Sequence, residues 1–271
     1  MSKILGVEEL AIKKIMSVSM QPGSADLDPW SARPLSGNSN GDLGLGPNNT
    51  QYKWSVTVGE WIRAWVYDLQ ATFVLDNKID GDAIPASEDT VWSETKNGSA
   101  TITTDGTHVS FNSTGANSDG GYCVFTHSQS DKNHFMIGYV TVTSISGAGG
   151  NGAIRFQVRT DGRDVCLDPA GIKTSANVAF MNTLSGTPAE IGERISNVTL
   201  ATEKWVEVYI HQPDGEDGIA ICYVDHSLRP VTQTALDVCD TSSSVNYVIG
   251  DAAASSSCLL KVRNIKVGRW T

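Results

Sequence analysis

The acidic side chains closest to a pattern for sugar chemistry are Glu203 and Glu207, which stand on either side of Trp205. Hydrolysis of a glycosidic bond needs two carboxyl groups held at a fixed separation across that bond. No third acidic residue lies between these two, and a chain with 30 acidic and 20 basic residues carries many carboxylates on solvated faces. The acidic residues of segment 214–217 lie in a Gly-bounded turn, which is typical of a polar hairpin tip. The sequence therefore predicts no catalytic residue, and we expect a protein that is not an enzyme.

Patterns for other reactive sites are also incomplete. Segment 76–82 is rich in oxygen ligands but places Lys78 where a calcium loop needs oxygen. The five histidines lack the HxH or HExxH spacing of a zinc site, and no Gly-x-Ser-x-Gly stands in a strand-to-helix context. The glycine-rich run 147–152 lacks the Lys-Ser/Thr that completes a phosphate-binding loop. We expect neither a metal ion nor a cofactor.

Sugar binding requires fewer residues in fixed positions than catalysis does, because an exposed aromatic ring and a few polar donors suffice. Four residues are candidates for stacking on a glycan: Trp92, Tyr122, Trp205 and Tyr209. Alternation along 205–211 places Trp205 and Tyr209 on the face opposite the branched residues, so we expect them outside the core. Three roles stay open for these two rings: stacking on a sugar, covering a neighbouring element, or packing against a partner subunit.

Short alternating segments bounded by turn residues predict β-strands over most of the chain. Two hairpins are clear: 101–104 with 107–111 around Asp105-Gly106, and 154–159 with 164–167 around Asp161-Gly162. Further strands are expected at 135–142, 205–211, 219–225, 247–250 and 259–267. This succession predicts an all-β fold, a two-sheet antiparallel sandwich preceded by an extended N-terminal arm.

The composition divides the chain into four segments. Residues 1–20 are expected to form a docking arm, since Ile4, Val7, Ile12, Ile15 and Val18 repeat an apolar pattern; a single amphipathic helix is the alternative. Residues 21–53 are rich in proline, glycine and asparagine and indicate a tether. Residues 54–85 form a tryptophan-rich connecting segment, whose rings either join a core or line a surface, and 86–271 form the sandwich.

Charge and hydropathy restrict the partners. A formal net charge of −10 argues against nucleic-acid binding, which depends on clustered Lys and Arg. The chain lacks an apolar run long enough for a transmembrane helix and shows no secretion signal at its start, so we expect no membrane contact and synthesis in the cytosol. The five cysteines are widely spaced and odd in number, which favours free buried thiols.

The order of segments in the last part resembles a known layout. A strand led by Trp205 is followed by Tyr223-Val224-Asp225, then by the strand 247–250, and then by a closing strand 261–267 that contains Arg263-Asn264. This succession resembles the laminin-G or concanavalin-A-like jelly roll over roughly residues 86–271. Such folds host lectins, glycosidases and inert spacers alike, so the resemblance implies a fold and not an activity. The Glu-x-Asp-x-x-Glu signature of jelly-roll glycosidases is absent.

The opening of the chain resembles a second pattern. Lys3, Ile4, Gly6 and Val7 match a short repeat that precedes laminin-G-like domains in virion proteins of tailed bacteriophages, although Ser17 replaces the glycine of the second unit. The resemblance implies a virion structural protein, assembled in the host cytoplasm as a homo-oligomer. Its partners would be major capsid, tail or neck proteins, and its role capsid decoration or tail attachment. The alternative is a host-recognition module that binds cell-surface glycan, and a polysaccharide-degrading enzyme is the next.

Overall fold

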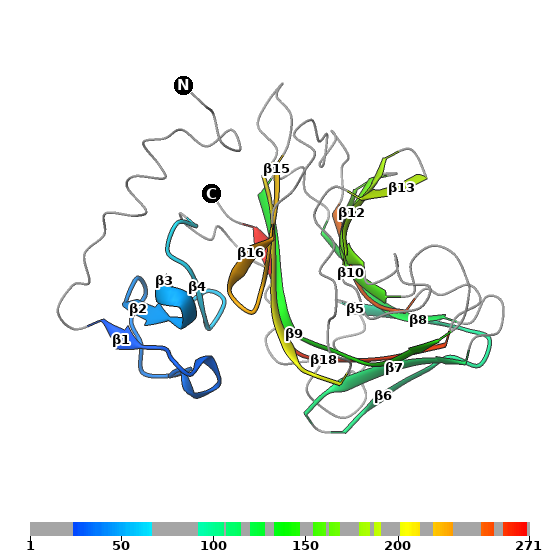
Figure 1. Cartoon of the computed structure of the whole chain (residues 1–271), viewed down its shortest axis with the longest axis horizontal. Helices are drawn as coiled ribbons and strands as arrows, with labels where there is room; N and C mark the ends of the chain where they lie inside the picture. Colours follow the sequence, from blue (N-terminus) through cyan, green and yellow to red (C-terminus); the bar gives the residue numbers. More distant parts are fainter. Residues whose placement is uncertain are drawn as a thin grey trace. The chain divides into compact units, whose positions relative to one another are not determined.

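The computed structural model describes residues 24–66, 92–105, 107–114, 120–127, 133–146, 154–160, 163–168, 179–184, 187–190, 201–211, 219–229, 245–251 and 257–269 (Figure 1). The chain divides into two compact units: Met1–Val74 with Gly268–Thr271, and Leu75–Val267. The five arm residues of segment 1–20 lie outside the described residues. No helix in the described ranges is long and apolar enough to cross a membrane.

The larger unit contains two seven-stranded sheets. The first, named here the β10 sheet, has the order β13 (Thr187–Glu190), β12 (Ala179–Leu184), β11 (Arg163–Asp168), β10 (Ile154–Thr160), β17 (Val245–Asp251), β8 (Gly120–His127) and β5 (Trp92–Asn97). Each neighbouring pair in this sheet is antiparallel.

The second sheet, named here the β14 sheet, has the order β16 (Ser227–Arg229), β15 (Ile219–Val224), β14 (Lys204–His211), β9 (Asn133–Ser146), β18 (Ser257–Arg269), β7 (Val109–Thr114) and β6 (Thr101–Thr104). The two sheets lie face to face (Figure 1), which confirms the predicted all-β sandwich.

The core lies between the two sheets. From the β14 sheet, Met136, Val206 and Val208 share one face and are at most 1% exposed. On the same face, His134 lies 2.8 Å from the hydroxyl of Tyr247 on β17, so this is the face that meets the β10 sheet. Burying each such aliphatic side chain stabilises the fold by about 1.5–3 kcal/mol.

Both predicted hairpins are confirmed. Thr160 pairs with Arg163 at the end of β10 and β11. Between β6 and β7, Asp105 Oδ1 accepts hydrogen bonds from the backbone N–H groups of Thr107 and His108, at 2.9 and 2.7 Å. Aspartate is favoured at a turn because its short polar side chain can accept such hydrogen bonds.

The smaller unit has more structure than its composition indicated. Its sheet has the order β1 (Ala25–Asp26), β2 (Leu43–Gly46), β3 (Thr50–Ser55) and β4 (Glu60–Arg63), with two 3-10 helices at Trp30–Ala32 and Pro47–Asn49. The expected tether over 21–53 and the connecting segment from 54 therefore contribute strands to one small sheet. Its buried aromatic residues are Trp30, Tyr52, Trp54 and Trp61, so the tryptophans of 54–61 join a core.

The glycines of β2 have a packing role that the composition of 21–53 does not indicate. A Cβ at Gly44 would lie 2.6 Å from Leu27 Cδ1, and a Cβ at Gly46 would lie 2.9 Å from Tyr52 Cε2. These glycines permit close packing of large side chains against the strand instead of chain flexibility. Composition alone does not distinguish the two uses of glycine.

Candidate functional site

Two of the four residues predicted to stack on a glycan are buried. Trp205 and Tyr209 are 2% and 1% exposed, although both lie on the face of β14 opposite the core residues Val206 and Val208. The expectation that this face of β14 looks outward is therefore wrong. Both faces of the strand are buried, and the two rings have a packing role in this structure.

Aromatic neighbours surround both rings. The ring centroids of Trp205 and Tyr139 are 4.9 Å apart in an edge-on arrangement, and those of Tyr209 and Phe135 are 6.3 Å apart. His226 stacks on Trp205 with a centroid distance of 6.4 Å. Cross-strand register explains the first two contacts, since Trp205 pairs with Tyr139 and Tyr209 with Phe135.

The carboxylate of Glu207 lies within this aromatic cluster. Glu207 is 1% exposed and accepts a hydrogen bond of 2.9 Å from the hydroxyl of Tyr209. The Nδ1 atom of His226 lies 3.9 Å from its other oxygen. Because burying a carboxylate is costly unless it is hydrogen-bonded, these partners stabilise Glu207 in place.

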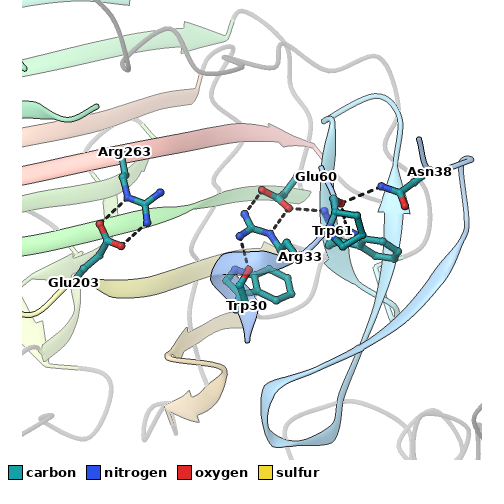
Figure 2. A network of polar contacts seen from close by, with 8 residues as sticks. Trp30, Arg33, Asn38, Glu60, Trp61, Glu203 and Arg263 are labelled. Atoms are coloured by element: carbon teal, nitrogen blue, oxygen red, sulfur yellow. Dashed lines mark hydrogen bonds and ion pairs between the residues drawn. The ribbon is translucent and has the colours of Figure 1, made fainter. Parts of the chain in front are cut away.

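Glu203, which precedes β14, is bound by an arginine of β18. Arg263 donates from Nε and Nη2 to the two carboxylate oxygens at 2.7 and 2.5 Å (Figure 2). The guanidinium of Arg263 also lies 3.9 Å from the ring centre of Tyr139. Partial burial would raise the pKa of Glu203, but the hydrogen bonds and charge of Arg263, aided by His108, outweigh it and lower that pKa. Both carboxylates near Trp205 are thus engaged in contacts within the protein.

The register of the β10 sheet separates the other two predicted residues. Tyr247 and Ile249 are fully buried and define the face of β17 that meets the β14 sheet. Trp92 pairs with Phe125, which pairs with Tyr247, so Trp92 occupies a position on this inner face. Tyr122 pairs with Gly250 instead and occupies a position on the opposite face, named here the outer face.

The outer face mixes polar and apolar residue types on its central strands. Along β10, residues 155, 157 and 159 alternate with Phe156 and Val158, whose β17 partners are the buried Ile249 and Tyr247. The outer-face positions of the three central strands and β11 include the polar or aromatic Tyr122, Thr126, Arg155, Gln157, Arg159, Asp164 and Asn246, and the row of Gln157 adds Val124, Val248 and Cys166. The strands that the structure describes in the larger unit all belong to the β10 sheet or the β14 sheet.

Sequence reasoning missed the arginines and the glutamine of this face. Segment 154–159 alternates apolar and polar residues, and this signal could have placed Arg155, Gln157 and Arg159 on one face. From the sequence alone, segment 154–159 predicts only a strand, because nothing in one strand indicates which other strands lie beside it. The partners Gly250 and Tyr122 lie far from β10 in sequence and are brought together by the sheet order.

The residue types of the outer face suit a polyhydroxylated ligand. Guanidinium, amide and carboxylate groups are planar and offer paired donors or acceptors, which match two adjacent hydroxyl groups of a sugar. An aromatic ring supplies an apolar surface for the sugar ring. Among the described residues, no group of three or more His, Cys, Asp or Glu could hold a metal ion.

Comparison with solved structures identifies the fold. The chain is similar to the carbohydrate recognition domain of Emp47p, with a TM-score of 0.50, 12% identity, and coverage of 75% of this chain and 97% of that one. It is similar to alginate lyase Aly36B, with a TM-score of 0.52, 11% identity, and coverage of 74% and 98%. The fold is a concanavalin A-like jelly roll.

A further structural neighbour has no function in its name. It is the protein SO2946 from Shewanella oneidensis MR-1, with a TM-score of 0.50, 10% identity, and coverage of 76% of this chain and 90% of that one. No family model and no curated protein matches the sequence. At such low identity, likeness to these jelly rolls establishes the fold, and function has to be argued from the residues.

Proposed function

We propose that this chain is a non-enzymatic carbohydrate-binding jelly roll, which binds a glycan on the outer face of the β10 sheet. The observation that carries the proposal is the register that aligns Arg155, Gly250 and Tyr122 across three adjacent strands. Neighbours of the same fold include a carbohydrate recognition domain and an alginate lyase, which is consistent with a saccharide ligand.

The positions of the buried rings favour this face over the other candidate. Trp205 and Tyr209 are at most 2% exposed, so a glycan could reach them only after repacking of the β14 sheet. Tyr122 occupies the register position between Gly250 of β17 and Thr95 of β5. Of the four aromatic candidates, Tyr122 is therefore the one we assign to glycan stacking.

Glycan-array binding of the full chain tests the proposal, with hits measured by titration calorimetry. Tyr122→Ala should weaken a hit by about tenfold or more, equivalent to about 1.4 kcal/mol. Tyr223→Ala, on the other sheet, is the matched control and should leave affinity unchanged. Circular dichroism of each variant separates lost binding from lost folding. Absence of binding to every glycan, or equal loss in both variants, would refute the proposal.

A non-enzymatic role has its own test. The engagement of Glu203 by Arg263 and of Glu207 by Tyr209 supports the absence of a carboxylate pair for hydrolysis. Incubation of the full chain with any polysaccharide it binds should yield no new reducing ends and no unsaturated sugar. Steady product formation that scales with protein concentration would show an enzyme.

We further propose that the module is carried by a tailed-phage particle. The repeat of Lys3, Ile4, Gly6 and Val7 at the start of the chain supports this, as does the apolar pattern through Val18. Such a segment could bury its apolar residues on a capsid, tail or neck protein, or in a homo-oligomer. Immunogold microscopy of purified particles with an antibody to residues 86–271 tests the location, and absence of label from all particles would contradict it.

A further inference from the structure

We infer that Asn97 is a site of spontaneous deamidation, at which the neutral side chain is converted to aspartate or isoaspartate. This inference is independent of the proposed function. Asn97 is followed by Gly98, and both residues are exposed. Because glycine has no Cβ, its backbone nitrogen can closely approach the side chain of the residue before it. Asparagine is among the thermolabile residues of proteins.

The reaction needs only the chain itself and water. The backbone nitrogen of Gly98 attacks Cγ of Asn97, so that a C–N bond forms and the bond from Cγ to Nδ2 breaks. The Gly98 amide loses its proton to solvent, and the departing group takes up a proton and leaves as ammonia. Water then opens the cyclic succinimide at either carbonyl group. The products are aspartate and isoaspartate, in which the backbone continues through the former side chain.

Asn97 lies at the turn that connects the two sheets of the larger unit. It is the last residue of β5 in the β10 sheet, and β6 of the β14 sheet begins at Thr101. The backbone N–H of Ala100 donates to the backbone oxygen of Asn97 at 3.3 Å, which closes the turn. Gly98 has a φ of 62°, a conformation that favours glycine. The turn therefore selects glycine after Asn97 and presents the reactive pair at the surface.

A second Asn-Gly pair, in the smaller unit, shows how the fold can prevent this reaction. Asn40 and Gly41 are also exposed, but both reacting groups are held. The backbone N–H of Gly41 donates to the backbone oxygen of Trp54 at 2.9 Å. The side-chain oxygen of Asn40 accepts a hydrogen bond of 3.2 Å from the backbone N–H of Val56. Both hydrogen bonds have to break before the ring can close at Asn40.

The pair at Asn97 lacks these restraints. Among the described residues, no hydrogen bond holds the side chain of Asn97 or the backbone nitrogen of Gly98. Because two hydrogen bonds have to break first at Asn40, we expect Asn97 to react faster than Asn40 by about tenfold or more.

Deamidation would change both the charge and the backbone of this turn. Either product adds one negative charge to a chain whose formal net charge is already −10. Isoaspartate also adds a methylene carbon to the backbone before Gly98. The carbonyl of Asn97 that accepts from the N–H of Ala100 then belongs to a free carboxylate outside the main chain. The isoaspartate form should therefore unfold more readily than Asn97→Asp, which acquires the charge alone.

The test measures deamidation at each asparagine of the full chain. Samples are incubated in mildly alkaline buffer, digested, and analysed by peptide mass spectrometry. In the folded chain, Asn97 should lose its amide faster than Asn40 by about tenfold or more. In urea, where the hydrogen bonds of Asn40 and Gly41 are lost, the two sites should react at similar rates. Asn97→Gln should remove the early product, because its larger ring closes more slowly, and the matched Asn40→Gln should leave that product unchanged.

Three outcomes would contradict the inference. Equal rates at Asn97 and Asn40 in the folded chain would overturn it, as would an Asn97 that stays intact in the folded chain but reacts in urea. A rate difference that persists in urea would contradict protection of Asn40 by the fold. Thermal unfolding of the aged form, enriched by anion exchange, tests the effect on the turn. An unfolding temperature equal to that of Asn97→Asp would contradict that effect.

Discussion

Arg33 and Glu60 lie 27 residues apart in sequence and form a two-point ion pair in the smaller unit. Their side chains are 2% and 1% exposed, and the Nη2 to Oε2 distance is 2.5 Å (Figure 2). Arg33 also donates to the backbone oxygen of Trp30, and its guanidinium lies 4.5 Å from the ring centre of that residue. The pair thus joins the 3-10 helix at Trp30–Ala32 to strand β4.

Removing one partner of this pair should unfold the smaller unit more readily. Arg33→Ala leaves the Glu60 carboxylate buried without its counter-charge, which costs about 3–5 kcal/mol. Urea unfolding followed by tryptophan fluorescence measures the loss. Lys53→Ala, in the same sheet, should change stability by less than about 0.5 kcal/mol. Equal stability of the Arg33 variant and the parent chain would mean that the pair is not a stabilising contact.

The smaller unit shows what composition cannot predict. Proline and glycine in 21–53 suggested a tether, yet Pro29 and Pro47 only border or begin short 3-10 helices. Gly44 and Gly46 allow Leu27 and Tyr52 to approach β2. Glycine indicates flexibility in an isolated chain, but it also permits close packing, and only the tertiary structure distinguishes the two.

The strands themselves were predictable from the alternation of apolar and polar residues. The expected strand 205–211 corresponds to β14 at Lys204–His211, and the hairpin around Asp105 forms as expected. Alternation did not indicate burial, because Trp205 and Tyr209 are large aromatic residues that can be buried as readily as exposed. Tyr122 was predicted as a site residue, but its row with Arg155 depends on sheet order, which one sequence does not provide.

The hydroxyl of Tyr209 should matter for stability and not for ligand binding. Tyr209→Phe keeps the ring packed against Phe135 but removes the donor to Glu207. A buried acceptor that loses its donor costs about 1–3 kcal/mol. Thermal unfolding should therefore shift to lower temperature, while affinity for any bound glycan stays unchanged. Lost glycan affinity with unchanged stability would return this face of β14 to consideration as the binding site.

A methyl group at Gly138 should disrupt the contact between β9 and β18. A Cβ there would lie 2.4 Å from Ile265 Cδ1 and 3.0 Å from the backbone oxygen of Asn264. Ile265 is 1% exposed and has little room to move, so Gly138→Ala should cost about 1–3 kcal/mol. Denaturant unfolding measures this loss. Combining it with Ile265→Val should recover part of the loss, and strictly additive destabilisation by the two changes would contradict the proposed overlap.

The ion pair between Glu203 and Arg263 should make stability depend on pH in the acidic range. The folded-state pKa of Glu203 is lowered from its ordinary value of 4.5, so the unfolded state binds a proton first as pH falls. The contribution of this pair is therefore fully present above pH 4.5 and is lost as pH falls through the lower, folded-state pKa.

The matching variant is Glu203→Gln, which keeps the size of the side chain but removes the titrating group. Because Glu203 and Arg263 are 32% and 23% exposed, solvent screening limits the pair to less than about 1 kcal/mol. Thermal unfolding at pH 7 and at pH 3 should show a larger difference for the parent chain than for the variant. An identical pH dependence in both proteins would mean that this carboxylate does not contribute to acid sensitivity.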